Sequence, residues 1–419
     1  MKKKILTLSD HPLSPSGVGT QTKYVIEALL QTGDYQVVSL AGAIKHANYQ
    51  PVKTEKYGDD WVIHPVDGYG TQDLVRSIVR TEKIDMVWIM TDPRFWGWLW
   101  EMDDEIRAVC PLVYYHVWDN YPYPTFNRKH YLSNDAIATI SKVTDDIVKT
   151  VAPEVESVYI PHAVDSEVFK PLDEEIIADY KNNTLTNAGN ADKFVFFWNN
   201  RNARRKQSGS LLFWFKELLE RIGEDKACLI MHTDPKDVHG QDLEKIIQEV
   251  GLDNGSVLFS TTKFPAEQLA LMYNMADCTI NVSDAEGFGL ATLESLSCAT
   301  PIIATMTGGL QEQVTDGEQF FGVGLEPASK AIIGSQDIPW IYEDRLNGED
   351  VVNAMQMIVE MDPEKRKEIG SAGRKHVQEN YNFKDFNESW VAFVEKVVKE
   401  NGSWDGRKKY QNWTLEEIL

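Results

Sequence analysis

Residues 281–294 carry the sequence Asn-Val-Ser-Asp-Ala-Glu-Gly-Phe-Gly-Leu-Ala-Thr-Leu-Glu, and this stretch decides the fold. The apolar run 278–282 predicts the end of a buried strand, and 291–297 has the composition of a helix. Between them, Gly287 and Gly289 bracket one aromatic residue. A strand, a glycine turn and a helix start form a phosphate cradle, because the unpaired N–H groups and the helix dipole there favour an anion.

Two glutamates frame this turn, Glu286 before it and Glu294 in the predicted helix after it. A carboxylate repels a phosphate at contact, so each glutamate is better suited to hydroxyl groups on either side of a diphosphate. Ribose, two phosphates and a hexose, in that order, make up a nucleotide-sugar. The pattern therefore predicts a nucleotide-sugar site at this turn.

At these residues the chain resembles the GT-B glycosyltransferases of family 4. Their signature is Glu-Gly-Phe-Gly-Leu with a second Glu eight positions after the first, and Glu286 and Glu294 match it. The run 304–309 also resembles the family's next loop. The glycine pair alone would equally suit an ordinary strand–helix turn, whereas the whole run favours the family. The resemblance assigns donor binding to Gly287, Phe288, Gly289, Leu290 and Glu294.

The composition limits the class of protein. A length of 419 residues suggests two or three domains, and 42% apolar and 25% charged residues are ordinary for a soluble globular protein. A net charge of −22, from 42 basic and 64 acidic residues, argues against nonspecific binding to nucleic acid or to a membrane surface.

Targeting signals and cysteine usage indicate the compartment. The apolar run after the N-terminal lysines is too short for a secretory leader, and no stretch approaches the roughly 20 apolar residues of a transmembrane segment. The four cysteines lie singly in apolar surroundings, without metal-ligand spacing, so reduced thiols are expected. These features predict a cytoplasmic protein.

Strand and helix patterns alternate along both halves of the chain, which predicts parallel sheets covered by helices. We therefore expect an α/β protein of the GT-B class, with two Rossmann-like domains facing a central cleft. The expected N-terminal domain, on the acceptor side, covers residues 1–165, and the expected donor-side domain covers 166–382. The resemblance implies that the last segment, 383–419, is helical and packs back on the first domain.

Basic residues cluster directly after the first strand of the second half, in Asn-Arg-Asn-Ala-Arg-Arg-Lys at 200–206. Breaking a sugar–phosphate bond places negative charge on the leaving diphosphate, which fixed cations stabilise. Arg201 and Lys206 match the family's Arg-x4-Lys pair, so the resemblance gives them this role. Asn200 and Gln207 stand where the family carries glycine, which leaves the path of the loop open. A solvated basic run, or a patch that contacts nucleic acid, is the other interpretation.

His116 ends a predicted strand, and ligands meet an α/β sheet at the C-terminal ends of its strands. The resemblance places a histidine there against the donor hexose, although a buried, hydrogen-bonded histidine is the other interpretation. Gly17 and Gly19, after the first strand, are expected to line the cleft near the diphosphate or the acceptor. No Asp or His cluster has metal-ligand spacing, so we expect no metal.

The resemblance implies a retaining glycosyltransferase that moves a hexose from a nucleotide-diphosphate sugar, as co-substrate, to an acceptor hydroxyl. No further cofactor is expected. The acceptor stays open among a saccharide, a lipid-linked acceptor, a small molecule and modified DNA. Two other functions fit the same pattern, a nucleotide-sugar epimerase of GT-B fold and a non-catalytic nucleotide-sugar-binding subunit.

Overall fold

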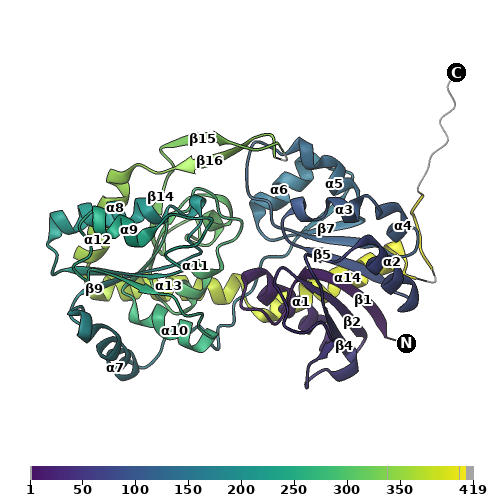
Figure 1. Cartoon of the computed structure of the whole chain (residues 1–419), viewed down its shortest axis with the longest axis horizontal. Coiled ribbons are helices and arrows are strands. Elements are labelled where there is room, and N and C mark those ends of the chain that lie inside the picture. The colour runs from purple at the N-terminus through teal and green to yellow at the C-terminus, as the bar shows by residue number, and fades with distance from the viewer. Residues whose placement is uncertain (1, 337, 405, 412–419) are drawn as a thin grey trace. The chain divides into compact units, whose positions relative to one another are not determined.

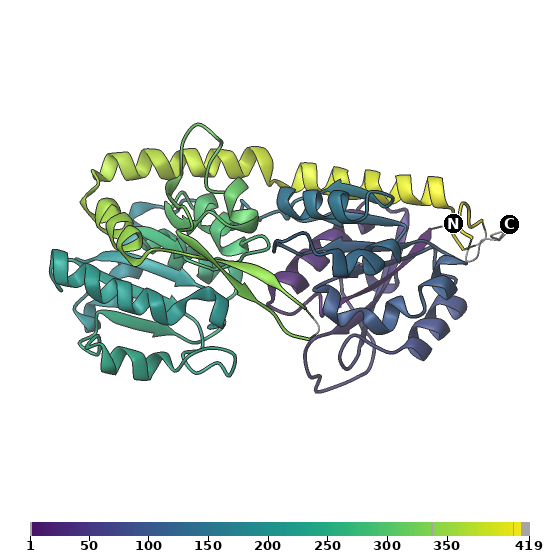
Figure 2. The ribbon, with the colours of Figure 1, turned by 90° about the horizontal axis from the view of Figure 1, so that it is seen from above.

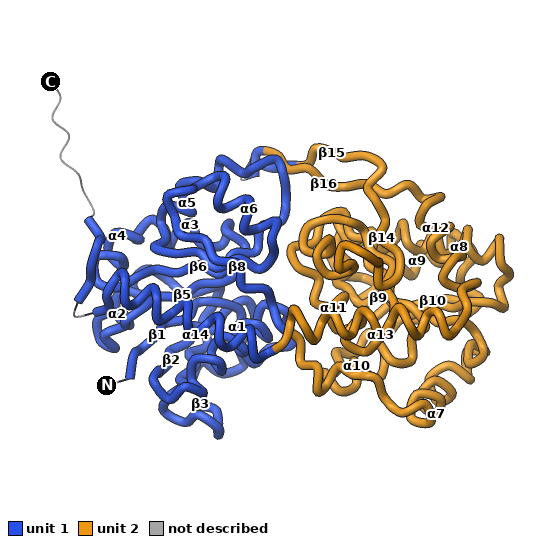
Figure 3. Tube along the Cα trace, turned by 180° about the vertical axis from the view of Figure 1, so that it is seen from behind, with its two compact units in different colours: residues 1–163, 334–339, 383–419 blue, residues 164–333, 340–382 orange. Residues whose placement is uncertain are grey.

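The computed structural model describes residues 2–336, 338–404 and 406–411. The chain forms two compact α/β units, which Figure 1 shows as ribbons and Figure 3 in two colours. Unit 1 comprises residues 1–163, 334–339 and 383–419, and unit 2 comprises 164–333 and 340–382. The first crossing between them therefore falls at 163/164, where the sequence suggested 165/166.

Unit 1 is built on an eight-stranded sheet in the order β3-β4-β2-β1-β5-β6-β7-β8. All neighbouring strands in it are parallel except β3 and β4. The strands are β1 (Lys3–Asp10), β2 (Tyr35–Gly42), β3 (Val52–Lys53), β4 (Trp61–Pro65), β5 (Met86–Met90), β6 (Leu112–His116), β7 (Ala136–Thr139) and β8 (Glu156–Tyr159). Strands β5, β6 and β7 are buried along their whole length, as expected where helices cover both faces of a parallel sheet.

The helices of unit 1 are α1 (Gly17–Leu30), α2 (Gln72–Thr81), α3 (Gly97–Trp100), α4 (Asp103–Arg107), α5 (Arg128–Leu132), α6 (Lys142–Val151) and α14 (Phe383–Asn401). The last of these comes from the end of the chain and runs along one side of the unit (Figure 2). Its Trp390 is fully buried, and the ring lies 4.7 Å from that of Tyr115 and 5.9 Å from that of Trp88. Helix α14 therefore completes the hydrophobic core of unit 1 and covers strands β5 and β6.

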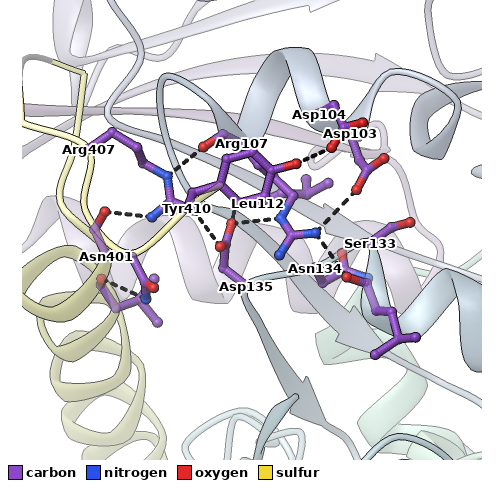
Figure 4. A network of polar contacts seen from close by, with 12 residues as sticks. Asp103, Asp104, Arg107, Leu112, Ser133, Asn134, Asp135, Asn401, Arg407 and Tyr410 are labelled. Carbon is purple, nitrogen blue, oxygen red and sulfur yellow. Dashed lines mark hydrogen bonds and ion pairs between the residues drawn. The ribbon is translucent and has the colours of Figure 1, made fainter. Parts of the chain in front are cut away.

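A buried polar network fastens the chain after α14 to the same sheet (Figure 4). Arg407 lies 2.5 Å from one carboxylate oxygen of Asp135, and Arg107 lies 3.3 Å from the other. The ring of Tyr410 lies against both guanidinium groups, at 4.7 Å from Arg107 and 5.3 Å from Arg407. Asp135 also accepts the N–H of Leu112, at 2.9 Å, so one carboxylate holds the segment around Arg407 against β6 and β7.

Unit 2 is built on a six-stranded parallel sheet in the order β11-β10-β9-β12-β13-β14. Its strands are β9 (Phe194–Asn199), β10 (Ala227–His232), β11 (Val257–Ser260), β12 (Cys278–Asn281), β13 (Ile302–Thr305) and β14 (Gly322–Leu325), and a separate antiparallel pair is formed by β15 (Ser329–Ile333) and β16 (Ile341–Arg345). Its helices are α7 (Glu174–Leu185), α8 (Ser208–Ile222), α9 (Leu243–Glu249), α10 (Ala266–Met275), α11 (Leu290–Ser297), α12 (Gly348–Glu360) and α13 (Pro363–Asn380). Apolar side chains of β9, β10, α8 and α12 form one continuous core.

Candidate functional site

The glycine turn joins β12 to the start of α11, as the sequence suggests. Gly289 precedes the helix with φ at +90°, a conformation that L side chains rarely adopt, and a Cβ there would lie 2.5 Å from Leu310 Cδ2. A Cβ on Gly309 would lie 2.6 Å from the carbonyl oxygen of Gly287. Both loops therefore need glycine at the place where they press against each other.

Phe288 anchors this turn by packing. Its side chain is 4% exposed, its ring lies 5.9 Å from that of Tyr381, and its carbonyl oxygen accepts a 2.6 Å hydrogen bond from Gln313. Leu290 begins α11, and the first N–H groups of a helix have no acceptor within it. The turn therefore holds a positive helix end at a fixed position, which suits an anion.

Lys206 meets Glu286 beside this turn. Its ammonium group donates to Oε2 of Glu286, and the two residues are only 7% and 8% exposed. Arg205 donates to the carbonyl oxygen of Ala285 and lies 3.9 Å from Oε1 of Glu286. Burial favours a raised pKa for Glu286, but the charges of Lys206 and Arg205 outweigh it and hold the pKa below its ordinary value. The site thus contains an ionised carboxylate with two cations around it.

Gln207 stands in the loop 200–207 at the position where the family carries glycine. The residue adopts a left-handed conformation, with φ at 55°. Its amide donates to Asp284 at 2.5 Å and accepts from Ser210 at 2.6 Å. The N–H of Asp284 donates in turn to the carbonyl oxygen of Arg205 at 2.8 Å. These hydrogen bonds offset the backbone strain and tie the two loops together.

Glu294 lies one turn into α11 and is held by Tyr273. The tyrosine hydroxyl donates to Oε2 of Glu294 at 2.7 Å and accepts from Asn199 at 2.8 Å. Burial raises the pKa of Glu294 to about 7, although the hydrogen bond from Tyr273 acts in the opposite direction. This carboxyl group therefore changes its charge near neutral pH.

Arg201 takes part in a different interaction. Its guanidinium grips the carboxylate of Asp237 at 2.6 and 3.1 Å, and its side chain is 61% exposed. The structure thus brings together Lys206, Glu286 and the turn 287–290, whereas Arg201 is paired elsewhere. A role for Arg201 at a diphosphate stays a prediction.

Comparison with known families identifies this region. Residues 186–376 match the family described as Glycosyl transferases group 1. This stretch, just under half of the chain, is similar to that family. It contains the glycine turn 287–290, Lys206 and both glutamates described above.

Several curated proteins are similar in sequence to part of this chain. The D-inositol 3-phosphate glycosyltransferase of Corynebacterium jeikeium is 33% identical over 118 residues, which are 27% of this chain and 28% of that relative. The match therefore spans only about a quarter of the relative's length.

Solved structures establish the fold of the whole chain. Sucrose-phosphate synthase from Thermosynechococcus elongatus superposes with a TM-score of 0.75 at 16% identity, covering 95% of this chain and 100% of that one. HepE from Anabaena, in a structure with UDP-glucose, gives a TM-score of 0.70 at 16% identity, covering 94% and 99%. The predicted GT-B fold of two Rossmann-like units is confirmed.

The remaining predicted site residues lie in unit 1. His116 is fully buried, and its Nε2 lies 2.8 Å from the hydroxyl of Tyr131. Burial lowers its pKa to about 3, so the ring is neutral at physiological pH. Gly17 begins α1, and a Cβ on Gly19 would lie 2.6 Å from the carbonyl oxygen of His11. The packing of these residues is clear, while their roles toward the donor remain predictions.

Among residues 2–336, 338–404 and 406–411, no group of three or more His, Cys, Asp or Glu side chains is placed to hold a metal ion. In the same part of the chain, no helix has the length and apolar character required to cross a membrane.

The sequence did not reveal four residues that hold the site in shape, Tyr273, Asp284, Glu343 and Arg345. Tyr273 comes from a helix that precedes β12, and nothing in its local pattern links it to Glu294. Asp284 lies two residues before Glu286 in the stretch 281–294, and this closeness was the one sequence feature that could have indicated its role at the site.

Proposed function

We propose that the chain is a retaining glycosyltransferase that transfers a hexose from a nucleotide-diphosphate sugar to an acceptor hydroxyl. The observation that carries this proposal is the buried pair of Lys206 and Glu286 beside the N-terminus of α11. The solved complexes of HepE with UDP and with UDP-glucose support a nucleotide-sugar as the donor class.

Each proposed role follows from the chemistry of the group. Lys206, Arg205 and the N–H groups at the start of α11 hold the diphosphate and stabilise the charge that develops on it. Glu286 accepts a hydrogen bond from a hexose hydroxyl and balances positive charge on the sugar ring. Glu294 accepts from the ribose hydroxyls. The resemblance adds Arg201 at the diphosphate and His116 at the hexose.

The proposed step forms a bond between the acceptor oxygen and the anomeric carbon and breaks the bond from that carbon to the phosphate oxygen. The acceptor enters on the face that the diphosphate leaves, so the anomeric configuration is retained. Its hydroxyl proton passes to the departing phosphate, and the products are a glycoside and a nucleoside diphosphate. This course needs no oxidant and no protein nucleophile.

We further propose that the reaction proceeds without a metal ion and that the protein works in the cytoplasm. The two cations around Glu286 support the first point, since they supply charge that a metal would otherwise supply. The four cysteines are free thiols, which supports a reducing compartment. Turnover that falls sharply in the presence of EDTA would contradict the metal-independent course.

A thermal-shift screen of the whole chain against UDP-, ADP- and GDP-hexoses tests donor binding. A donor at 100 times its dissociation constant stabilises the folded protein by about 2.7 kcal/mol. Lys206→Ala is expected to reduce turnover by roughly 100-fold or more, by analogy with the loss of one oxyanion donor. A Lys206→Ala variant with normal turnover would exclude this residue from the reaction.

The two other functions predict different products. A nucleotide-sugar epimerase converts its donor to a new sugar nucleotide without any acceptor, whereas a transferase then gives only slow hydrolysis. A non-catalytic subunit binds the donor and forms neither product. Incubation of the donor alone, followed by chromatography of the nucleotides, separates these cases.

A further inference from the structure

The β15–β16 hairpin is attached to the phosphate-binding loops by charged residues that have no part in the proposed reaction. The two strands form their own sheet, with Ser329 opposite Arg345. The second strand ends in Glu343, Asp344 and Arg345. Each of these three residues makes a polar contact with one of the loops around Lys206.

Arginines and carboxylates follow one another in these contacts, in the order Arg204, Glu343, Arg345 and Asp284. Arg204 grips Glu343 with both terminal nitrogens, at 2.7 and 2.6 Å. Arg345 lies 2.7 Å from Asp284 and 3.2 Å from Glu343. The N–H of Asp344 donates to the carbonyl oxygen of Asp284 at 2.9 Å. Because the side chains of Glu343 and Asp284 are each only 3% exposed, solvent screens these interactions weakly.

Asp284 connects the hairpin to the active loops on both sides of Lys206. Its N–H donates to the carbonyl oxygen of Arg205 at 2.8 Å, and its carboxylate accepts from Gln207 at 2.5 Å. It also lies two residues before Glu286 in the chain. A displacement of Asp284 therefore moves both members of the Lys206–Glu286 pair.

We propose that Arg345 and Glu343 are positioning residues, which fix the loops that present Lys206 and Glu286 to the diphosphate of the donor. This inference rests on the proposed function. The hairpin holds the site from outside and need not touch the substrate. Without Arg345, two nearly buried carboxylates lose the cation that they share, and their repulsion loosens the connection to Asp284.

The test compares wild type with Arg345→Gln, using the UDP-, ADP- or GDP-hexose that stabilises the wild-type chain most. Isothermal titration calorimetry is expected to give a dissociation constant at least about 10-fold higher for Arg345→Gln. The reason is that Lys206 and Glu286 are then no longer held in position for their charge-assisted hydrogen bonds to the donor. The matched control is Lys330→Gln, an exposed position on the other strand of the hairpin, which should stay within about twofold of wild type.

The dependence of affinity on pH distinguishes positioning from a general loss of stability. Burial raises the pKa of Asp284 to about 6, while Arg345, Arg204 and the hydrogen bond from Gln207 lower it and Glu343 raises it. Donor affinity is expected to fall as pH drops through this range. Arg345→Gln removes one lowering charge, so its fall should occur at higher pH. If Arg345 had a purely structural role, Arg345→Gln would lower the melting temperature and leave the pH midpoint of donor affinity unchanged.

Asp284→Asn supplies the double-mutant comparison. If Arg345 acts through Asp284, Arg345→Gln adds less than about twofold to the loss that Asp284→Asn already causes. If Arg345→Gln fails to fold, Arg345→Lys replaces it in the test. Lysine keeps the positive charge but cannot contact Asp284 and Glu343 together, so a smaller loss of donor affinity is expected.

Failure of the proposed function and failure of the positioning role give different results. A wild-type chain that binds none of the nucleotide-sugars removes the proposed function. Wild-type binding together with unchanged affinity and unchanged pH midpoint in Arg345→Gln overturns the positioning role alone.

Discussion

Replacing Lys206 with methionine isolates the ion pair at the centre of the site, because methionine keeps most of the side chain and loses the charge. Glu286 would then retain Arg205, at 3.9 Å, as its neighbouring cation. Removing one partner of a buried pair destabilises a protein by about 3–5 kcal/mol, and the remaining arginine places the expected loss near 3 kcal/mol. At about 2–4 °C per kcal/mol, the melting temperature of unit 2 should fall by roughly 6–12 °C.

The direction of the pH dependence follows from the same pair. In wild type the pKa of Glu286 is lowered, so its stabilisation is present above the ordinary carboxyl pKa and is lost as pH falls through the folded-state value. In Lys206→Met, burial without that cation raises the pKa, so stability is lost as pH rises. The difference in the free energy of unfolding between wild type and Lys206→Met should therefore shrink as pH falls from 8 to 5.

Urea unfolding of the full chain at both pH values measures this difference. Lys245→Met is the matched control, because Lys245 forms an exposed pair with Glu249 and should change stability by less than about 1 kcal/mol. The double variant Lys206→Met/Glu286→Gln should recover most of the lost stability. A loss at pH 8 no larger than that of the control, or a loss that grows toward pH 5, would refute the reasoning.

Three further predictions use other parts of the structure. Gly309→Ala, whose Cβ would lie 2.6 Å from a backbone oxygen of the turn, should weaken donor binding by about 10-fold or more in titration calorimetry, whereas Gly97→Ala, in open space, should not. Glu294→Gln should raise the melting temperature at pH 8 and leave it nearly unchanged at pH 5, because the raised pKa of Glu294 makes its ionisation destabilising only as pH rises through about 7. Arg407→Ala should destabilise unit 1 by about 3 kcal/mol in denaturant unfolding, because it leaves the buried carboxylate of Asp135 with one cation, and donor affinity should not change; an unaltered unfolding midpoint would contradict it.

Much of the fold follows from local patterns. Short apolar runs between helical patterns located most strands of both central sheets, because parallel strands buried on both faces lack polar residues. Strands β3, β4 and β14 were not located. The glycine turn and its two glutamates were equally visible, since neighbouring residues in the sequence form it. The match of residues 186–376 to the group 1 family confirms the resemblance of that stretch to glycosyltransferases, while the donor-binding roles of its residues stay predictions.

Other features depend on residues that are distant in the sequence. The polar run that begins at residue 181 lacks a clear helical period in the sequence, yet helix α7 continues through it as far as Leu185. The segment 97–107 is divided into α3 and α4 at Met102, whose φ of −119° is not helical, and no sequence pattern marks this break. Strands β15 and β16 were missed, since a half-exposed hairpin lacks the strong apolar signal of a central strand.

Charge partners were the least predictable feature. Arg201 and Lys206 stand five positions apart in one basic run, yet one pairs with Asp237 and the other with Glu286. Composition and spacing do not determine which carboxylate lies opposite, since that depends on how separate loops meet at the edge of the sheet.

Hydrogen–deuterium exchange of the full chain, with and without the stabilising nucleotide-sugar, tests the central claim most directly. A diphosphate held at the start of α11 accepts hydrogen bonds from amides that otherwise exchange with solvent. We therefore expect slower exchange in peptides that contain residues 286–292 and 204–207. Protection confined to peptides elsewhere, with these two stretches unchanged in the bound protein, would contradict it.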